Sequence, residues 1–267
     1  MAQQATQPPS EADLRALELA SPGEMTLIDH LRELRTRVFI CAVTVAVMVM
    51  VSFVFRDRVF DFLLEPGRNA VKDGQEFRLN SFSPTDRVFV VFKICGYAGL
   101  ILASPIVIYQ ILAFVIPGLT PRERRAIFPS VFGFLAFLLA GMAFSYYVIL
   151  PASLGFLFGF EDKVFENEIG AQQYIGFVTR MIFWVGLCFE MPMVMMFLAK
   201  LRVARAGQML RFWRYAIVII AVIAAVATPT PDAVTMSLVI VPLLGLYVLG
   251  IGMAWVAQPK RPAESPG

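Results

Sequence analysis

Residues 126–150 read AIFPSVFGFLAFLLAGMAFSYYVIL, a run of 25 residues without one charged side chain. At 1.5 Å per residue a helix of this length reaches about 37 Å, enough to cross the roughly 30 Å hydrocarbon core of a bilayer. The rest of the chain has the same character, since 58% of its residues are hydrophobic and only 16% are charged. We therefore predict one integral membrane domain whose apolar surface is solvated by lipid.

Five further apolar stretches flank this run, and charged, proline or glycine residues separate them. The six predicted spans are 38–55, 88–116, 126–150, 174–199, 215–228 and 235–257. The sequence thus predicts an all-α, polytopic membrane protein with six transmembrane helices. An even number of crossings puts both termini on the same side of the membrane.

The distribution of basic residues predicts which side that is. Segments on the side of the termini carry fourteen Lys and Arg against eight Asp and Glu, whereas the opposite segments carry seven against eleven. The positive-inside rule then places both termini in the cytoplasm. We expect a disordered tail over 1–24, the membrane domain over 25–257 and a second cytoplasmic tail over 258–267. Because 1–24 resembles neither a secretory signal nor a transit peptide, a bacterial cytoplasmic (inner) membrane is expected.

The last two spans differ from the others in length. Span 215–228 has only fourteen residues, or about 21 Å of helix. Pro242 and several glycines interrupt 235–257, so a short or kinked helix is expected there as well. Short helices at one side of the bundle predict a locally thinned membrane.

Two carboxylates lie in segments assigned to the cytoplasm. Glu33 is on the polar face of an amphipathic helix that precedes the first span, where it can pair with Arg37 at i,i+4. Glu123 is three residues after Thr120, a spacing that fits a helix cap. In the connector PGLTPRERR (117–125) it also has three arginines around it, and it could accept a guanidinium from a partner. Spacing alone leaves both readings open for each residue.

Glu190 lies inside the fourth span, ten residues before Lys200. A carboxylate within the bilayer is unfavourable by roughly 2.5–3.5 kcal/mol on insertion scales, so it normally faces a partner, a cavity or a proton path. A proton-coupled transporter with Glu190 as its carrier is therefore one hypothesis, although no inverted repeat supports it.

Enzymatic chemistry is not indicated. His30 is the only histidine, no predicted span contains an aspartate or histidine, and no phosphate-binding loop or nucleophile elbow is present. We predict no catalytic activity, no metal and no cofactor. The net charge of +3 gives no reason to expect nucleic acid as a partner.

Several motifs together identify a family. They are H30-L-R-E-L-R35, A103-S-P-I-V-I-Y-Q110, F114-V-I-P-G-L-T-P-R-E-R-R125, F189-E-M-P192, Pro66 and T228-P-T-P-D232. In this combination the chain resembles TatC, the multispanning receptor subunit of the twin-arginine protein translocase. The resemblance extends over nearly everything from Met25 to Trp255.

The resemblance implies a glove-shaped six-helix protein that binds the twin-arginine signal peptides of folded cargo. Glu33 and Glu123 would receive the paired arginines on the cytoplasmic face, and Phe114, His30 and Arg35 would complete that site. Two glutamates facing two guanidiniums would form charge-assisted bonds that lysine reproduces poorly.

The resemblance also implies partner subunits. Glu190 and Asp232 would form an intramembrane polar site for the single-span subunits TatA and TatB, within an oligomeric complex surrounded by membrane lipid. Pro66, Pro105 and Pro192 would have structural roles. With no nucleotide site, energy would come from the proton-motive force, which supplies about 2.3 kcal/mol per charge and 100 mV.

Overall fold

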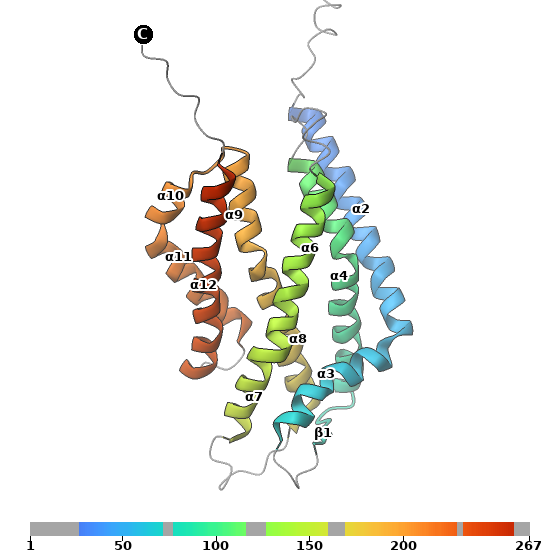
Figure 1. The fold of residues 1–267 in the computed structure, drawn as a ribbon. Helices are drawn as coiled ribbons and strands as arrows, with labels where there is room; N and C mark the ends of the chain where they lie inside the picture. Colours follow the sequence, from blue (N-terminus) through green and yellow to red (C-terminus); the bar gives the residue numbers. More distant parts are fainter. Residues whose placement is uncertain (1–26, 72–76, 116–126, 160–168, 229–231, 259–267) are drawn as a thin grey trace, which may run out of the picture.

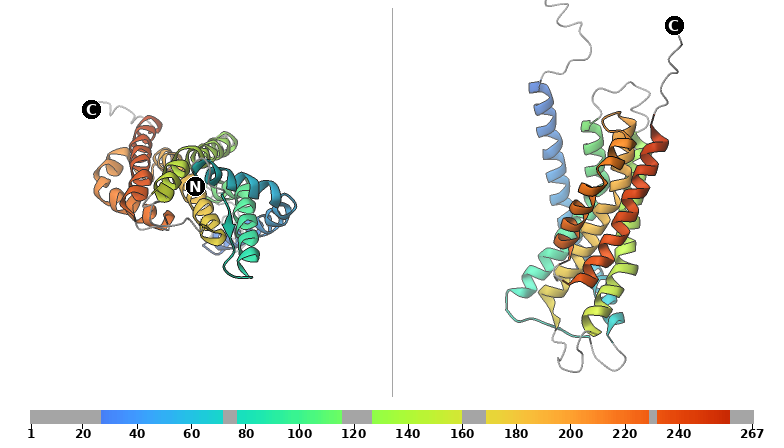
Figure 2. Two further views of the ribbon diagram at one scale, coloured as in Figure 1. Left: turned by 90° about the horizontal axis from the view of Figure 1, so that it is seen from below. Right: turned by 90° about the vertical axis from the view of Figure 1, so that its left-hand side faces the viewer.

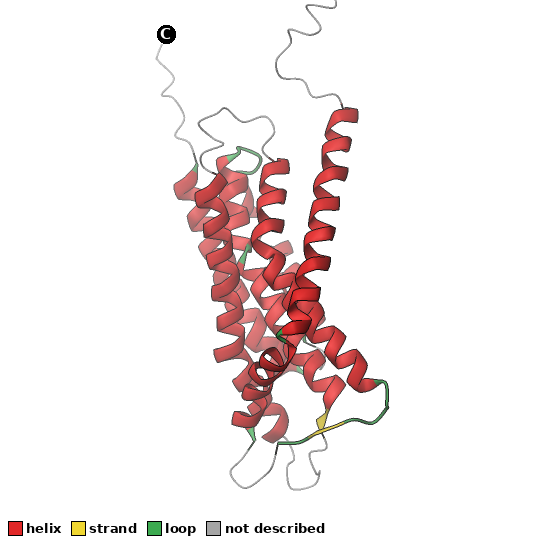
Figure 3. Ribbon diagram, turned by 90° about the vertical axis from the view of Figure 1, so that its right-hand side faces the viewer, coloured by secondary structure: helices red, strands yellow, loops and turns green. Residues whose placement is uncertain are grey.

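The structure, a computed structural model, describes residues 27–71, 77–115, 127–159, 169–228 and 232–258. Helices account for nearly all of these residues (Figure 3). Five helical stretches are long and apolar enough to cross a membrane, and a shorter apolar helix accompanies them. The predicted all-α polytopic fold is confirmed.

The elements follow the predicted spans in order. The helices are α2 (Leu27–Val54), α3 (Arg56–Ala70), α4 (Asp86–Val115), α6 (Ile127–Phe144), the π-helical turn η1 (Ser145–Ile149), α7 (Leu150–Gly159), α8 (Ala171–Phe189), α9 (Met191–Lys200), α10 (Ala206–Arg211), α11 (Trp213–Ala227) and α12 (Ala233–Ala257). Strands β1 (Leu79–Asn80) and β2 (Ile169–Gly170) form a short parallel pair.

The bundle has two distinct ends. At the end that we call the upper end, α2 begins and α12 finishes (Figure 1). At the lower end lie α3, β1 and the beginnings of α4 and α8. Viewed from below, the helices spread from α2 and α4 on one side to α11 and α12 on the other, and in the side view α2 extends past α4 at the upper end (Figure 2).

The third span is longer than predicted. The predicted span ends at residue 150, but the helix continues through α7 to Gly159. Pro151 lacks an amide donor and would normally interrupt an α-helix. The π-turn η1 directly before it changes the hydrogen-bond pattern, and the chain remains helical.

Helix α3 was not predicted at all, because it contains Pro66 and six charged side chains. Two tyrosine hydroxyls from distant helices hold it in place. Tyr146 donates to the Phe62 carbonyl at 2.9 Å, the acceptor left free because Pro66 has no amide four residues later. Tyr174 donates to the next carbonyl, that of Leu63, also at 2.9 Å.

The last two spans differ from each other. Helix α11 has only 15 residues, so the short fifth span is confirmed. Helix α12 has 25 residues and continues through Pro242, which makes the sixth span longer than predicted. Proline does break the fourth span, where α8 gives way to α9 at Glu190 and Pro192 occupies the first turn of α9.

Small residues allow the helices to approach closely. A Cβ at Gly99 of α4 would lie 2.5 Å from the Val49 Cα of α2. Between α6 and α8, a Cβ at Gly141 would lie 2.5 Å from the Phe189 Cβ. Such contacts replace the hydrophobic driving force that is missing between helices in lipid.

Candidate functional site

The upper part of α2 carries an ion pair that is anchored to α4. Arg37 donates to the Glu33 Oε1 from Nε at 2.9 Å and from Nη2 at 2.6 Å. The remaining nitrogen, Nη1, donates to the Gln110 Oε1 at 3.0 Å. The predicted i,i+4 pair is therefore confirmed. Its connection to Gln110 on the neighbouring helix fixes the orientation of the guanidinium and, through it, of the Glu33 carboxylate.

An aromatic contact also joins α2 to α4. The His30 ring stacks on the Phe114 ring, with centroids 4.5 Å apart and planes inclined by 19°. His30 lies one turn before Glu33, and Phe114 lies one turn after Gln110. Both pairs thus join the same two helices at the upper end.

The Glu33 carboxylate retains an unused acceptor. Its Oε2 is buried and has no hydrogen-bond partner in the described part of the chain. A buried carboxylate oxygen without a donor is unfavourable by about 1–3 kcal/mol, which a guanidinium donor would relieve. Arg35 is exposed on the same helix, and Glu123 lies outside the described residues.

Glu190 lies at the break between α8 and α9, ten residues before the end of the membrane-spanning stretch Ala171–Lys200. Its side chain is buried, and neither carboxylate oxygen has a hydrogen-bond partner among the described residues. It lines a largely apolar cavity of about 160 Å³ between α4, α6 and α8. The other residues around this cavity are Leu100, Ile101, Ser104, Val107, Ile108, Ile111, Leu138, Met142, Phe183 and Leu187.

The remaining predicted residues do not join this cavity. Asp232 caps α12 and accepts the Thr235 amide at 2.6 Å. Pro66 is buried in α3 at the lower end, and Pro105 lies inside α4, which stays continuous around it. The structure therefore brings together His30, Glu33 and Phe114, but it does not bring Asp232 into the cavity that Glu190 lines.

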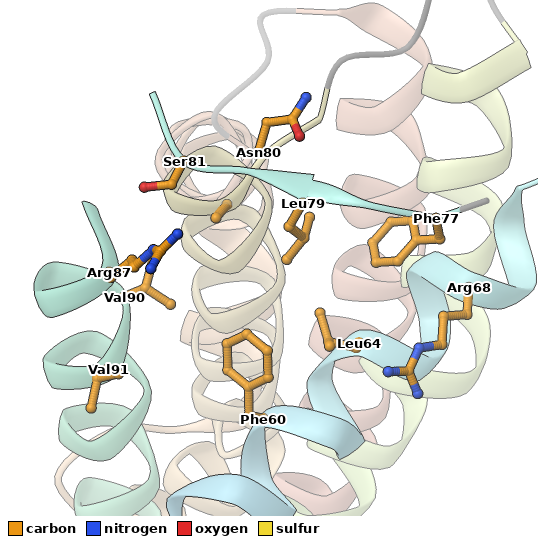
Figure 4. A pocket seen from close by; sticks show the side chains of 11 residues that line it. Phe60, Leu64, Arg68, Phe77, Leu79, Asn80, Ser81, Arg87, Val90 and Val91 are labelled. Atoms are coloured by element: carbon orange, nitrogen blue, oxygen red, sulfur yellow. The ribbon is translucent and has the colours of Figure 1, made fainter. Parts of the chain in front are cut away.

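A second cavity opens at the lower end of the bundle, whereas Glu33 lies at the upper end (Figure 4). It has a volume of about 550 Å³ and is bounded by α3, α4 and the segment that contains β1. Arg68 and Arg87 contribute to its walls, together with apolar side chains such as Phe60 and Leu79. In the described part of the chain, no group of three His, Cys, Asp or Glu side chains could hold a metal ion.

Known proteins share both the sequence and the fold. The family described as "Sec-independent protein translocase protein (TatC)" matches residues 29–242, most of the membrane bundle. The chain belongs to the TatC family. It is therefore a core subunit of the twin-arginine (Tat) protein translocase.

TatC relatives of this chain come from plastids and bacteria. The chloroplastic TATC of Arabidopsis thaliana is 40% identical over 244 residues, which are 91% of this chain and 69% of that protein. TatC of Synechocystis is 37% identical over 235 residues, 88% of this chain and 90% of its own length. A crystal structure of a twin-arginine translocase receptor TatC superposes with a TM-score of 0.77 at 35% identity, covering 85% of this chain and 99% of that one.

Some contacts between α2 and α4 near Glu33 could not be found from spacing. The contact of Gln110 with Arg37 and the stacking of His30 on Phe114 both depend on how α2 crosses α4. The sequence signal that could have found Gln110 is its position at the end of the motif ASPIVIYQ.

Proposed function

We propose that this TatC-family chain is the receptor that binds the two arginines of a twin-arginine signal peptide, with Glu33 as one acceptor and Glu123 as the other. The observation that supports it best is the state of Glu33. Arg37 holds one of its carboxylate oxygens, and the other has no donor in the described part of the chain.

Guanidinium chemistry explains the selectivity for arginine. An arginine presents several N–H donors in a planar fork, so it can bond to a carboxylate through two parallel hydrogen bonds. Lysine offers a compact ammonium without that geometry. Because Gln110 and Arg37 fix the Glu33 carboxylate, little conformational entropy is lost when the peptide binds.

The finer features of the complex follow from the same proposal. The cavity beside Glu190 would receive a polar side chain from a single-span subunit of the TatA or TatB type, because an unpaired carboxylate among apolar helices favours such a donor. Transport of folded cargo would use the proton-motive force. The upper end would face the cytoplasm of a bacterium, since the basic connectors favour that orientation.

Peptide binding by the purified protein tests the receptor role. The probe is a fluorescent signal peptide with an Arg-Arg pair, compared with the same peptide carrying Lys-Lys. The proteins are the wild type, Glu33→Gln, Glu123→Gln and the control Asp57→Asn, which removes an exposed carboxylate at the lower end. We expect the wild type and the control to prefer Arg-Arg, and each glutamine variant to bind it about tenfold more weakly or worse.

Equal binding of both peptides by all four proteins would overturn the assignment. In that case Glu33 would serve only its pair with Arg37. If Glu33→Gln alone weakened binding, the peptide would use one fixed carboxylate and Glu123 would be a helix cap.

A further inference from the structure

Two cationic side chains face each other within the membrane-spanning helices. The side chains of Lys93 on α4 and Arg180 on α8 both reach Gly176 of α8, and α4 packs against α8. A Cβ at Gly176 would lie 3.1 Å from the Lys93 Nζ and 3.7 Å from the Arg180 Nη2. The two groups are close enough to repel each other.

No acid offsets these two charges in the described part of the chain. The ion pairs found there involve neither Lys93 nor Arg180. Arg180 uses one nitrogen, Nε, to donate to the Gly176 carbonyl at 2.9 Å. This bond fixes the guanidinium and leaves its terminal nitrogens for another acceptor.

A pair of unneutralised cations in a transmembrane segment needs an anion. Charged residues within spans are rare because they are unfavourable in lipid, and they normally pair with a group of opposite charge. Because Gly176 has no side chain, the Lys93 ammonium can lie close to the α8 backbone, where a Cβ would crowd it. Both cationic residues are only partly buried, so an anion can approach them from outside the bundle.

The depth of the pair indicates which anion. Lys93 and Arg180 follow the first residues of α4 and α8 by seven and nine positions, or about 10 Å and 14 Å along each helix. Helix α4 has 30 residues, so it spans about 45 Å, the full bilayer with its headgroups. Both side chains thus start just inside the hydrocarbon region of the lower leaflet, and their long stems reach the phosphate level.

We propose that Lys93 and Arg180 form a binding site for the phosphate of a phospholipid in the leaflet at the lower end of the bundle. A phosphate has several acceptor oxygens that the guanidinium and the ammonium can share. Phosphatidylglycerol, an anionic lipid, is preferred over phosphatidylcholine, because its headgroup has no cation that competes with Lys93 and Arg180 for the phosphate. This site lies at the opposite end of the bundle from Glu33 and does not depend on the proposed recognition of signal peptides.

An aromatic pair lies on the membrane-interior side of this site. Tyr97 and Phe183, one turn deeper on α4 and α8, contact each other edge to face with centroids 5.4 Å apart. They lie deeper in the membrane than the cations and offer an apolar surface to the beginning of the acyl chains.

Lipid retention by the intact protein tests the site. The protein is purified in a mild detergent, equilibrated with a defined mixture of phosphatidylglycerol and phosphatidylcholine, and analysed by native mass spectrometry. The variants are Lys93→Gln with Arg180→Gln, the charge-preserving Lys93→Arg, and the control Arg87→Gln, an exposed arginine near the same end of α4. A parallel sample receives inorganic phosphate in place of lipid, and circular dichroism and gel filtration verify folding.

We expect the wild type, Lys93→Arg and Arg87→Gln to retain one phosphatidylglycerol, and the double variant to bind it about tenfold more weakly or worse. Retention of phosphatidylglycerol by the folded double variant at the wild-type level would overturn the proposal. Inorganic phosphate binding without lipid retention would also overturn it, since the site would then recognise a free anion. If the double variant does not fold, the folded Lys93→Arg variant provides the test. This variant keeps both charges, so loss of lipid from it would contradict the proposal.

Discussion

The imidazole of His30 stacks on the phenyl ring of Phe114 with centroids 4.5 Å apart. This contact joins the first turns of α2 to the last turn of α4, and it borders the Glu33 carboxylate one helical turn away. The stack therefore restrains the helix segment from which Glu33 projects.

Removal of the phenyl ring should weaken peptide binding without unfolding the bundle. Stacked aromatic pairs contribute about 0.5–1.5 kcal/mol beyond burial, so Phe114→Ala should lower affinity for the Arg-Arg peptide about three- to tenfold. His30→Phe keeps a ring in the stack and serves as the matched control. Fluorescence titration measures both, and an equal loss in the two variants would show that the imidazole itself contacts the peptide.

The hydroxyl of Tyr146 should stabilise the lower end. In Tyr146→Phe, the stack on Phe62 at 4.2 Å can persist, but the Phe62 carbonyl loses its donor and the Glu65 bond at 3.0 Å is lost. We expect a loss of about 1–2 kcal/mol in unfolding free energy, seen as a lower melting temperature in detergent. Tyr147→Phe is the control, because Tyr147 is 72% exposed. An unchanged melting temperature of Tyr146→Phe would mean that a water molecule replaces the hydroxyl as hydrogen-bond donor.

A single methyl group should distinguish two glycines of α4. At Gly99 a Cβ meets the backbone of Val49 at 2.5 Å, whereas a Cβ at Gly96 has no atom of another element within 4 Å. Because backbone atoms cannot move individually, Gly99→Ala must push α2 away, at a cost of about 1–3 kcal/mol. Gly96→Ala should be neutral or stabilising by up to about 1 kcal/mol, since alanine favours helix. Thermal unfolding of both variants tests this prediction. Similar melting temperatures for Gly99→Ala and Gly96→Ala would contradict the close approach of α2 and α4 at Gly99.

The spans were predictable because each one depends only on its own composition. Long apolar runs such as 126–150 must be solvated by lipid, whatever their neighbours are. Helix α3 was not predictable in this way, because its sequence is polar and contains Pro66. Its stability comes from Tyr146 and Tyr174, which are more than 80 positions away in the chain.

In the candidate site too, contacts within one helix were predictable and contacts between helices were not. The pair of Glu33 with Arg37 follows from helical spacing within one element, and it was predicted. The bond to Gln110 spans 73 positions and requires the crossing of α2 with α4. The cavity at Glu190 requires three helices at once, so the sequence could indicate an unusual carboxylate but not its surroundings.

At Glu190 the requirements of stability and of function should oppose each other. Glu190 is buried beside apolar side chains, and its oxygens lack donors in the described residues. In Glu190→Met a side chain of similar size fills the same space without an unsatisfied polar group, so unfolding free energy should rise by about 1–3 kcal/mol. If the cavity receives a polar group of a partner subunit, the same variant should lose transport of a twin-arginine cargo by vesicles that contain the complete translocase.

Leu187→Met is the control for this experiment, because Leu187 lines the same cavity and remains apolar. Melting temperature and transport are measured on each variant. A stabilised Glu190→Met that still transports cargo at the wild-type rate would remove Glu190 from the mechanism, whereas a destabilised Glu190→Met would mean that the carboxylate has a donor in the intact protein. Glu190→Gln separates charge from hydrogen bonding, since it keeps an acceptor and adds a donor. Transport by Glu190→Gln but not by Glu190→Met would show that the partner needs a hydrogen bond at this position and not a negative charge.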